Sequence, residues 1–208
     1  CVLSRRGLLQ GAAVLPALSL AGRARAQEAG LLRIGLSSYP PNLTPWVQAG
    51  TAANTFKLLT MRGLLGYAPD GALRGELAER WERSGETGWT FHLRAATFHN
   101  GRRVTAEDVK WTLEQVAAPR STAFFRTAMQ GIERIETPDA GTVTLVMKEP
   151  SATLPHWMAA PFMPIVAADS IGANGQGVTA GPFVLKDAER GVRLELEAFG
   201  GFYRPGLP

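Results

Sequence analysis

The stretch of sequence that decides the fold is WERSGETGWTFHLRAATFHNGRRVTAEDVKWTL, residues 81–113. Trp89, Phe91 and Leu93 alternate with polar residues, which is the period-2 pattern of a half-buried strand. The Asn100-Gly101 pair that follows is typical of a turn, because both residue types tolerate a positive φ. The first two-thirds of the stretch therefore predict a strand followed by a tight turn.

A helix is expected to begin directly after Thr105. The Thr105 side chain can cap the free amides of the first turn, and Asp108 stands three residues on, as in a short-armed capping box. Val104 and Val109 have the spacing of a hydrophobic staple. The helix should end before Pro119, which cannot continue it. Strand, turn and helix together form a scaffold signature and contain no catalytic motif.

Taken as a whole, the stretch resembles the family 5 solute-binding proteins of bacterial ABC importers, which bind oligopeptides, dipeptides or nickel. The resemblance rests on residues 81, 89–94, 98–101 and 105–109. It continues in TAGPFVL, residues 179–185, which is similar to the strand entry G-T-G-P-Y/F of the family. Residues 199–206 are similar to another family segment, through Phe202-Tyr203-Arg204. The first of these departs from the family pattern, because Ala180 stands where Gly is usual.

The resemblance implies a mixed α/β (α+β) fold of the periplasmic-binding-protein type II kind, in an incomplete form. Residues 27–49 would be the first segment of domain I, and residues 50–164 the small inserted domain II. Residues 165–208 would return into domain I. Members of the family are considerably longer, so domain III, the facing wall of the ligand cleft, is expected to be absent.

Residues 1–26 have the layout of an export signal. SRRGLL at residues 4–9 resembles the twin-arginine motif, an apolar run follows at residues 11–21, and residues 24–26 read A-x-A. The segment predicts a twin-arginine-type signal peptide and a periplasmic location. The alternative is an ordinary amphipathic first helix, which Gly11 and Pro16 disfavour.

The charge of the chain argues against nucleic acid as a partner. The net charge is +4, but residues 1–26 hold four of the 22 Lys and Arg and no acid, which leaves 18 basic and 18 acidic residues elsewhere. A phosphate-binding surface needs clustered positive charge. No apolar run reaches the ~18 residues of a membrane span. Cys1 is the only cysteine and precedes the mature chain, so no disulfide or thiolate site is expected there.

Alternation and breakers predict the remaining elements. Strands are expected around residues 32–36, 132–135 and 143–147, and a helix over residues 51–65. Residues 183–185 and 192–196 are expected to pair as a hairpin. Residues 172–177 are interpreted as a flexible loop, since they lack the Lys-Ser/Thr of a phosphate-binding loop.

An enzyme, a metal site and a cofactor have little support in the sequence. His92, His99 and His156 do not have the spacing of converging metal ligands. Glu107 and Asp108 form a carboxylate pair, but in the first turn of a helix such charges offset the macrodipole. No G-x-S-x-G elbow marks a nucleophile. We therefore expect no catalytic residue, no metal and no cofactor.

Three places are candidates for contact with a ligand. They comprise Ser37, Ser38, Tyr39, Phe124, Phe125, Ala180 and Gly181. The resemblance implies that residues 37–39 offer backbone hydrogen bonds to an extended ligand, and that the two phenylalanines lie where relatives place aromatic residues near it. The alternatives are a structural turn for residues 37–39 and core packing for the phenylalanines. The turn at residues 180–181 is the third place.

The resemblance implies a monomer that captures peptides or similar small solutes and delivers them to ABC permease subunits. Closure of two lobes over the solute would be a population shift driven by differential affinity. The alternative is a truncated remnant or partial gene model. Because pockets bury 70–90% of a ligand, half a cleft is expected to bind solutes weakly or not at all.

Overall fold

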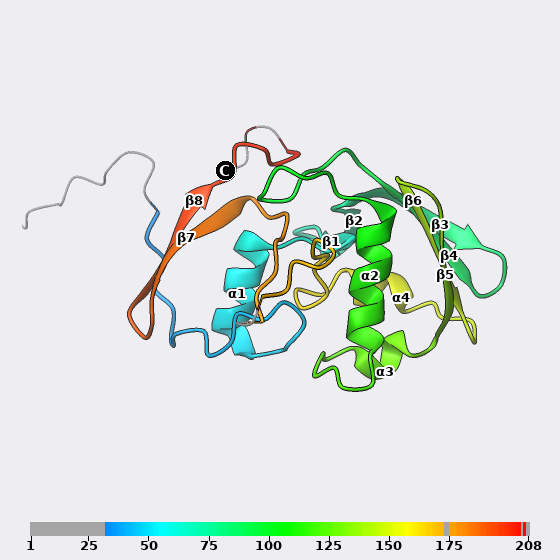
Figure 1. Ribbon diagram of the computed structural model, residues 1–208, viewed down its shortest axis with the longest axis horizontal. Helices are drawn as coiled ribbons and strands as arrows, with labels where there is room; N and C mark the ends of the chain where they lie inside the picture. The colour runs from blue at the N-terminus through cyan, green and yellow to red at the C-terminus, as the bar shows by residue number, and fades with distance from the viewer. Residues whose placement is uncertain (1–31, 173–174, 205, 207–208) are drawn as a thin grey trace, which may run out of the picture. The chain divides into compact units, whose positions relative to one another are not determined.

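The computed structural model describes residues 32–172, 175–204 and 206 of the 208-residue chain. The predicted signal peptide, residues 1–26, lies outside the described residues. The chain divides into two units, Cys1–Gly35 and Leu36–Pro208. All helices and strands described below belong to the second unit (Figure 1). The domain boundaries at residues 49/50 and 164/165 stay predictions.

A four-stranded antiparallel sheet forms the centre of this second unit. Its strand order is β3 (Ala78–Ser84), β4 (Gly88–Leu93), β6 (Thr142–Met147) and β5 (Ile132–Asp139). Phe91 on β4 lies opposite Trp81 on β3 and Val143 on β6. Phe91 and Val143 are fully buried. The predicted strands at residues 89–93, 132–135 and 143–147 are therefore confirmed.

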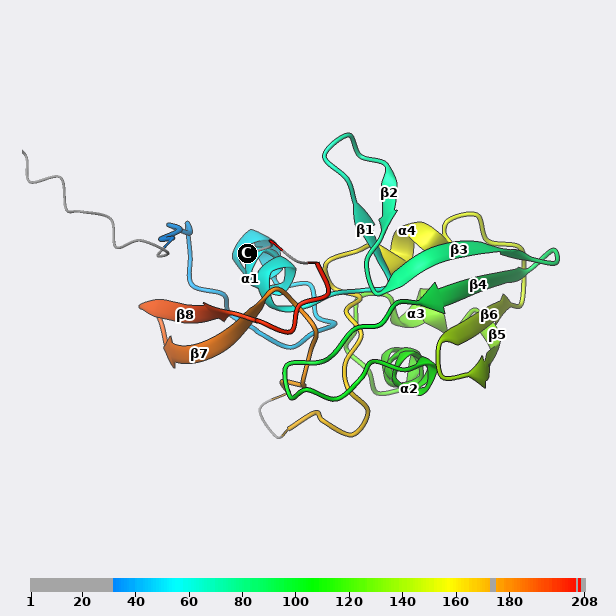
Figure 2. The same ribbon diagram turned by 90° about the horizontal axis from the view of Figure 1, so that it is seen from above.

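Helix α2 (Ala106–Ala117) packs against β5 and β6, and Figure 2 shows it nearly end-on beside these strands. Val109, Leu113 and Val116 recur at helical spacing and are buried. The backbone N–H of Thr105 donates to Asp108 Oδ2 at 2.9 Å, so the predicted capping contact is present. The helix ends before Pro119, as expected.

The described residues hold seven further elements. They are α1 (Gly50–Thr60), β1 (Leu65–Tyr67), β2 (Leu73–Gly75), α3 (Arg126–Met129), α4 (Leu154–Met158), β7 (Phe183–Glu189) and β8 (Arg193–Ala198). Strands β1 and β2 pair as one hairpin and β7 and β8 as another, the latter as predicted. The turn at Asn100-Gly101 is also confirmed, because Gly101 has a φ of +82°.

The predicted helix over residues 51–65 is too long, since α1 ends at Thr60 and Leu65 begins β1. The cause lies in tertiary packing. A Cβ added at Gly63 would come within 2.8 Å of the Met158 carbonyl oxygen and 2.9 Å of that of Met163. Gly63 therefore allows an extended chain to pass close to another backbone, which helical periodicity alone does not reveal.

The predicted strand at residues 32–36 is wrong. The structure shows no strand there, and the side chains of Leu32, Ile34 and Leu36 are 73%, 53% and 42% exposed. Alternation only favours a strand, whereas the strand itself needs a partner that completes its hydrogen-bond ladder. None of the described strands pairs with this segment.

The core of the unit contains residues from α2 and from segments that precede and follow it in the chain. It joins Phe91 and Leu145 of the sheet, Leu113 of α2, Leu154 of α4 and Val166 of the following segment. Within the described residues, no helix combines the length and the apolar character needed to cross a membrane.

Candidate functional site

Four aromatic side chains, Phe124, Phe125, Trp157 and Phe162, gather in what we call the aromatic surface. The Phe124 ring lies edge-on to Phe125 at 5.1 Å and to Phe162 at 4.9 Å between centroids. Phe125 stacks on Phe162 at 5.3 Å and approaches Trp157 at 6.2 Å. Edge-to-face and offset arrangements are the favourable geometries for such rings. The segment before α3 thus meets α4 and the residues after it.

The backbone of the loop that carries Phe124 is held by Trp46, which packs against Trp111. The Phe124 N–H donates to the carbonyl of Trp46 at 3.1 Å, and Trp46 Nε1 donates to the carbonyl of Pro164 at 3.1 Å. Trp46 also lies 6.2 Å from Trp111 of α2. Core packing explains the half-buried Phe125, but 54% of Phe124 stays exposed. The exposed Phe124 ring, on a backbone held by hydrogen bonds, is able to stack on an apolar group of a solute.

The loop at residues 37–39 lies outside regular secondary structure. Ser37 and Ser38 are exposed, and Tyr39 is half-buried before the buried Pro40. Exposed serines leave backbone groups accessible to a solute. The ligand-contact role of these residues, like that of Phe124 and Phe125, stays a prediction.

The turn at Ala180-Gly181 is buried and packs against the end of α1. A Cβ at Gly181 would come within 2.1 Å of the Thr60 carbonyl carbon, so this position accepts only glycine without a shift. The Thr179 hydroxyl donates to the Thr60 carbonyl at 2.8 Å, and His99 Nε2 lies 3.1 Å from both the N and the O of Gly181. Burial lowers the pKa of His99. This turn therefore joins α1 to the turn of the opening stretch.

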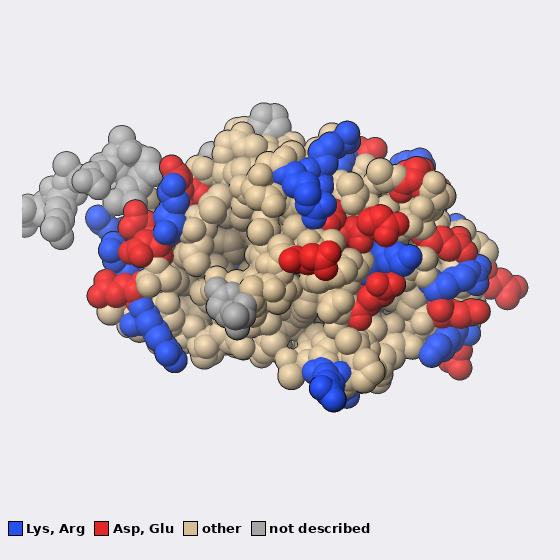
Figure 3. Space-filling model, viewed as in Figure 1, with Lys and Arg blue, Asp and Glu red and all other residues tan. Residues whose placement is uncertain are grey.

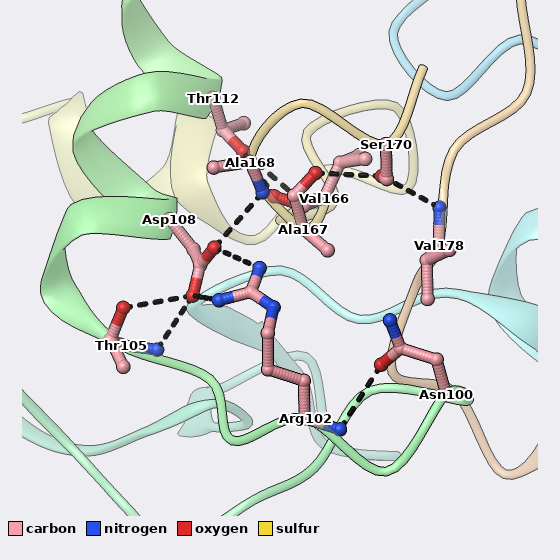
Figure 4. Close-up of polar contacts among 10 residues, drawn as sticks. All are labelled: Asn100, Arg102, Thr105, Asp108, Thr112, Val166, Ala167, Ala168, Ser170 and Val178. Atoms are coloured by element: carbon pink, nitrogen blue, oxygen red, sulfur yellow. Dashed lines mark hydrogen bonds and ion pairs between the residues drawn. The ribbon is translucent and has the colours of Figure 1, made fainter. Parts of the chain in front are cut away.

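Asp108 illustrates how the carboxylates of this chain are used (Figure 4). It is 1% exposed and accepts hydrogen bonds from both terminal nitrogens of Arg102, from the N–H and hydroxyl of Thr105, and from the Ala168 N–H. Burial alone would raise the pKa of Asp108, but the bonds from Arg102, Ala168 and Thr105 outweigh it and the pKa is lowered. A carboxylate held in this way caps α2, as expected, and also fixes the helix to the segment at residue 168.

Sequence reasoning missed a second buried carboxylate, Glu76. It is 3% exposed and lies 2.9 Å from Arg74 Nη2, 3.3 Å from Arg204 Nη2 and 3.4 Å from Arg62 Nε. The Tyr203 hydroxyl also donates to it, and burial together with this bond raises the pKa of Tyr203. The signal was the Tyr203-Arg204 pair of the family-like segment, whose partner lies 127 residues away. Glu76 ties that segment to β2.

The remaining titratable groups are considered as possible metal ligands or acid–base pairs. In the part of the chain that the structure describes, no group of three or more His, Cys, Asp and Glu is arranged to hold a metal ion. His92 lies 3.2 Å from Glu82 on the neighbouring strand and is half-buried. This pair joins two neighbouring strands of the sheet.

Solved structures with the same fold define the class of the protein. The protein AgaA from A. tumefaciens R10, solved in complex with agropinic acid, superposes with a TM-score of 0.77 at 39% identity, over 81% of this chain and 36% of that one. The murein tripeptide binding protein MppA of Escherichia coli superposes with a TM-score of 0.74 at 20% identity, over 81% and 38%. The chain therefore has the expected periplasmic-binding-protein type II fold, in part.

The sequence comparisons name the family. The middle region of the bacterial extracellular solute-binding proteins, family 5, matches residues 72–208, and the chain belongs to this family. A Brucella ovis protein named as an ABC transporter peptide-binding protein is 29% identical over 145 residues, or 64% of this chain and 27% of the relative. The chain thus spans about a quarter of the length of this relative.

Proposed function

We propose that this chain is the solute-binding component of an ABC importer, which captures peptides or similar small solutes in the periplasm and delivers them to the permease subunits. The observation that carries the proposal is the likeness to AgaA, which was solved with a small solute bound and is 39% identical over 81% of this chain. The peptide-binding name of the Brucella ovis relative favours peptides.

Binding, and not chemistry, is the mechanism that fits the residues. The buried carboxylates Asp108 and Glu76 are saturated by arginines and backbone groups, so neither is available as a general base. The aromatic surface offers the exposed Phe124 ring to an apolar part of the solute, and residues 37–39 offer backbone groups to an extended one. The protein is accordingly proposed to be no enzyme and to need no cofactor.

Export completes the proposal. Family membership supports a location outside the cytoplasmic membrane, and residues 1–26 would direct the chain there by the twin-arginine route. A monomer that exchanges between open and closed forms would then meet the permease. Ligand binding shifts that exchange only by its differential affinity for the two forms.

Isothermal titration of the purified chain with a tripeptide mixture, and separately with agropinic acid, tests the proposal. We expect saturable heat with one of them, at weak affinity because a partial cleft buries little of a ligand. Phe124→Ala should lower that affinity by about two- to tenfold, since one stacked ring contributes roughly 0.5–1.5 kcal/mol. Tyr67→Ala is the matched control, because Tyr67 is 44% exposed and lies outside the aromatic surface.

Two results would overturn the proposal. Peptide fragments appearing in the mixture by mass spectrometry would show catalysis. No saturable heat with either probe would favour the alternative, a remnant with the family fold and no competent cleft. Equal weakening by Phe124→Ala and Tyr67→Ala would leave binding intact and remove the assignment to the aromatic surface.

A further inference from the structure

A cavity of about 320 Å³ lies between α1, the turn at His99-Asn100 and strand β7. The side chains that give it an apolar wall are Leu43, Phe56, Met61, Val178, Val184 and Leu185. Apolar cavities of about 150 Å³ already bind benzene. The cavity therefore has room for a fused two-ring molecule.

The lining of the cavity carries no fixed charge. None of its described lining residues is Lys, Arg, Asp or Glu. His99 is the titratable group among them, and burial lowers its pKa, so the ring is neutral at pH 7. Figure 3 shows a hollow on a broad uncharged area between the charged β7–β8 hairpin and the charged sheet. The cavity is open on one side, and a charged ligand would lose part of its hydration here without gaining a counter-charge.

Both threonine hydroxyls and the histidine ring at the wall are already hydrogen bonded within the chain. The Thr60 hydroxyl donates to the Phe56 carbonyl at 2.9 Å, and the Thr179 hydroxyl donates to the Thr60 carbonyl at 2.8 Å. His99 Nε2 lies in contact with the backbone of Gly181 at 3.1 Å. A ligand would therefore gain from burial of apolar surface more than from new hydrogen bonds.

We propose that this cavity is a second binding site, separate from the aromatic surface, for an uncharged and mostly apolar molecule or group of one or two rings. The two sites share no lining residue. The aromatic surface is built from residues 124–125, 157 and 162, and the cavity from residue 43, the end of α1, the 99–100 turn and residues 176–179 and 184–185. The site does not depend on the proposed import function.

Indole is the probe, and its binding to the full chain is followed by two-dimensional NMR and isothermal titration. We expect saturable binding with shifts at the methyl groups of Leu43, Val178 and Leu185. Val184→Phe, which adds a ring to the cavity, should weaken binding at least tenfold. Val192→Phe is the matched control, since Val192 is 68% exposed and is not part of the lining. The charged analogues tryptamine and indole-3-acetate should bind at least tenfold more weakly than indole.

A second filling variant, Leu43→Phe, guards against a fold defect in Val184→Phe, and both are compared with the wild type by thermal melting. A well-folded filling variant with unchanged indole affinity would overturn the proposal, as would equal affinity for the charged analogues or the absence of saturable binding. Loss of indole binding in Phe124→Ala, with retention in Val184→Phe, would assign the probe to the aromatic surface and also overturn it. Failure of peptide binding leaves these results unaffected.

Discussion

The four-stranded sheet with α2, here called the sheet body, and the β7–β8 hairpin use the same alternating pattern but bury very different amounts of surface. In the sheet body, Phe91, Val143 and Leu145 have no exposed surface. In the hairpin, Leu194 and Leu196 are only half-buried, although they alternate with charged residues as regularly.

The difference comes from what covers each sheet. Helix α2 packs against β5 and β6 of the four-stranded sheet. The hairpin is contacted by α1, and mainly through β7. An isolated two-stranded hairpin is marginally stable in water. Alternation therefore predicts that a strand forms, and a second layer decides how much stability the strand contributes.

Phe91→Ala tests the sheet body and is expected to have the largest effect. The substitution removes a fully buried ring between β3 and β6, so the free energy of unfolding should fall by about 3–5 kcal/mol. Leu196→Ala in the hairpin is the comparison, and its half-buried side chain should cost about 1 kcal/mol. Urea unfolding followed by circular dichroism measures both. Equal losses would show that the hairpin is packed as well as the sheet body.

Asp108→Ala should destabilise the sheet body by about 3 kcal/mol, because it leaves Arg102 without its partner and unties Ala168. The pKa of Asp108 is lowered from its ordinary value of 3.8, so its contribution is fully present above about pH 4 and is lost as the pH falls through the lower folded value. Asp108→Asn keeps the shape and removes the titration. Urea midpoints from pH 2 to 7 measure the difference, and parallel profiles for wild type and Asp108→Asn would contradict it.

Local signals explain what the sequence predicted correctly. The Asn100-Gly101 turn and the Thr105–Asp108 cap each act over four residues or fewer, and the structure has both. The family resemblance extended these local patterns to a fold.

Long-range packing explains what the sequence did not reveal. Nothing near Glu76 indicates that Tyr203 and Arg204 will meet it. Nothing near Gly63 shows that the carbonyls of Met158 and Met163 lie so close to it that a side chain would clash. The cavity beside His99 likewise arises from segments up to 142 residues apart, Leu43 to Leu185, and has no local pattern.

Lys57 gives a smaller effect with the same sign of pH dependence as Asp108, but in the alkaline range. It is 1% exposed on α1, its ammonium donates to the Val47 carbonyl, and burial lowers its pKa to about 8. Between pH 8 and its ordinary 10.5 the unfolded chain binds more protons than the folded chain, so stability should rise with pH by about 2 kcal/mol. Lys57→Met should abolish this rise, and urea unfolding at pH 7.5 and 10 measures it. A rise that persists in Lys57→Met would assign the titration to another group.

Arg193→Ala, in the hairpin, is expected to have the smallest effect. Arg193 lies 3.3 Å from Asp187, 3.4 Å from Glu189 and 3.3 Å from Glu195, but its side chain is 57% exposed. Exposed ion pairs gain little and are screened by salt, so the loss should be about 0.5 kcal/mol and vanish in 1 M NaCl. Arg102→Ala, which strips the buried Asp108 of its partner, should cost several times more and change little with salt. Similar losses for the two arginines would mean that burial does not separate the hairpin from the sheet body.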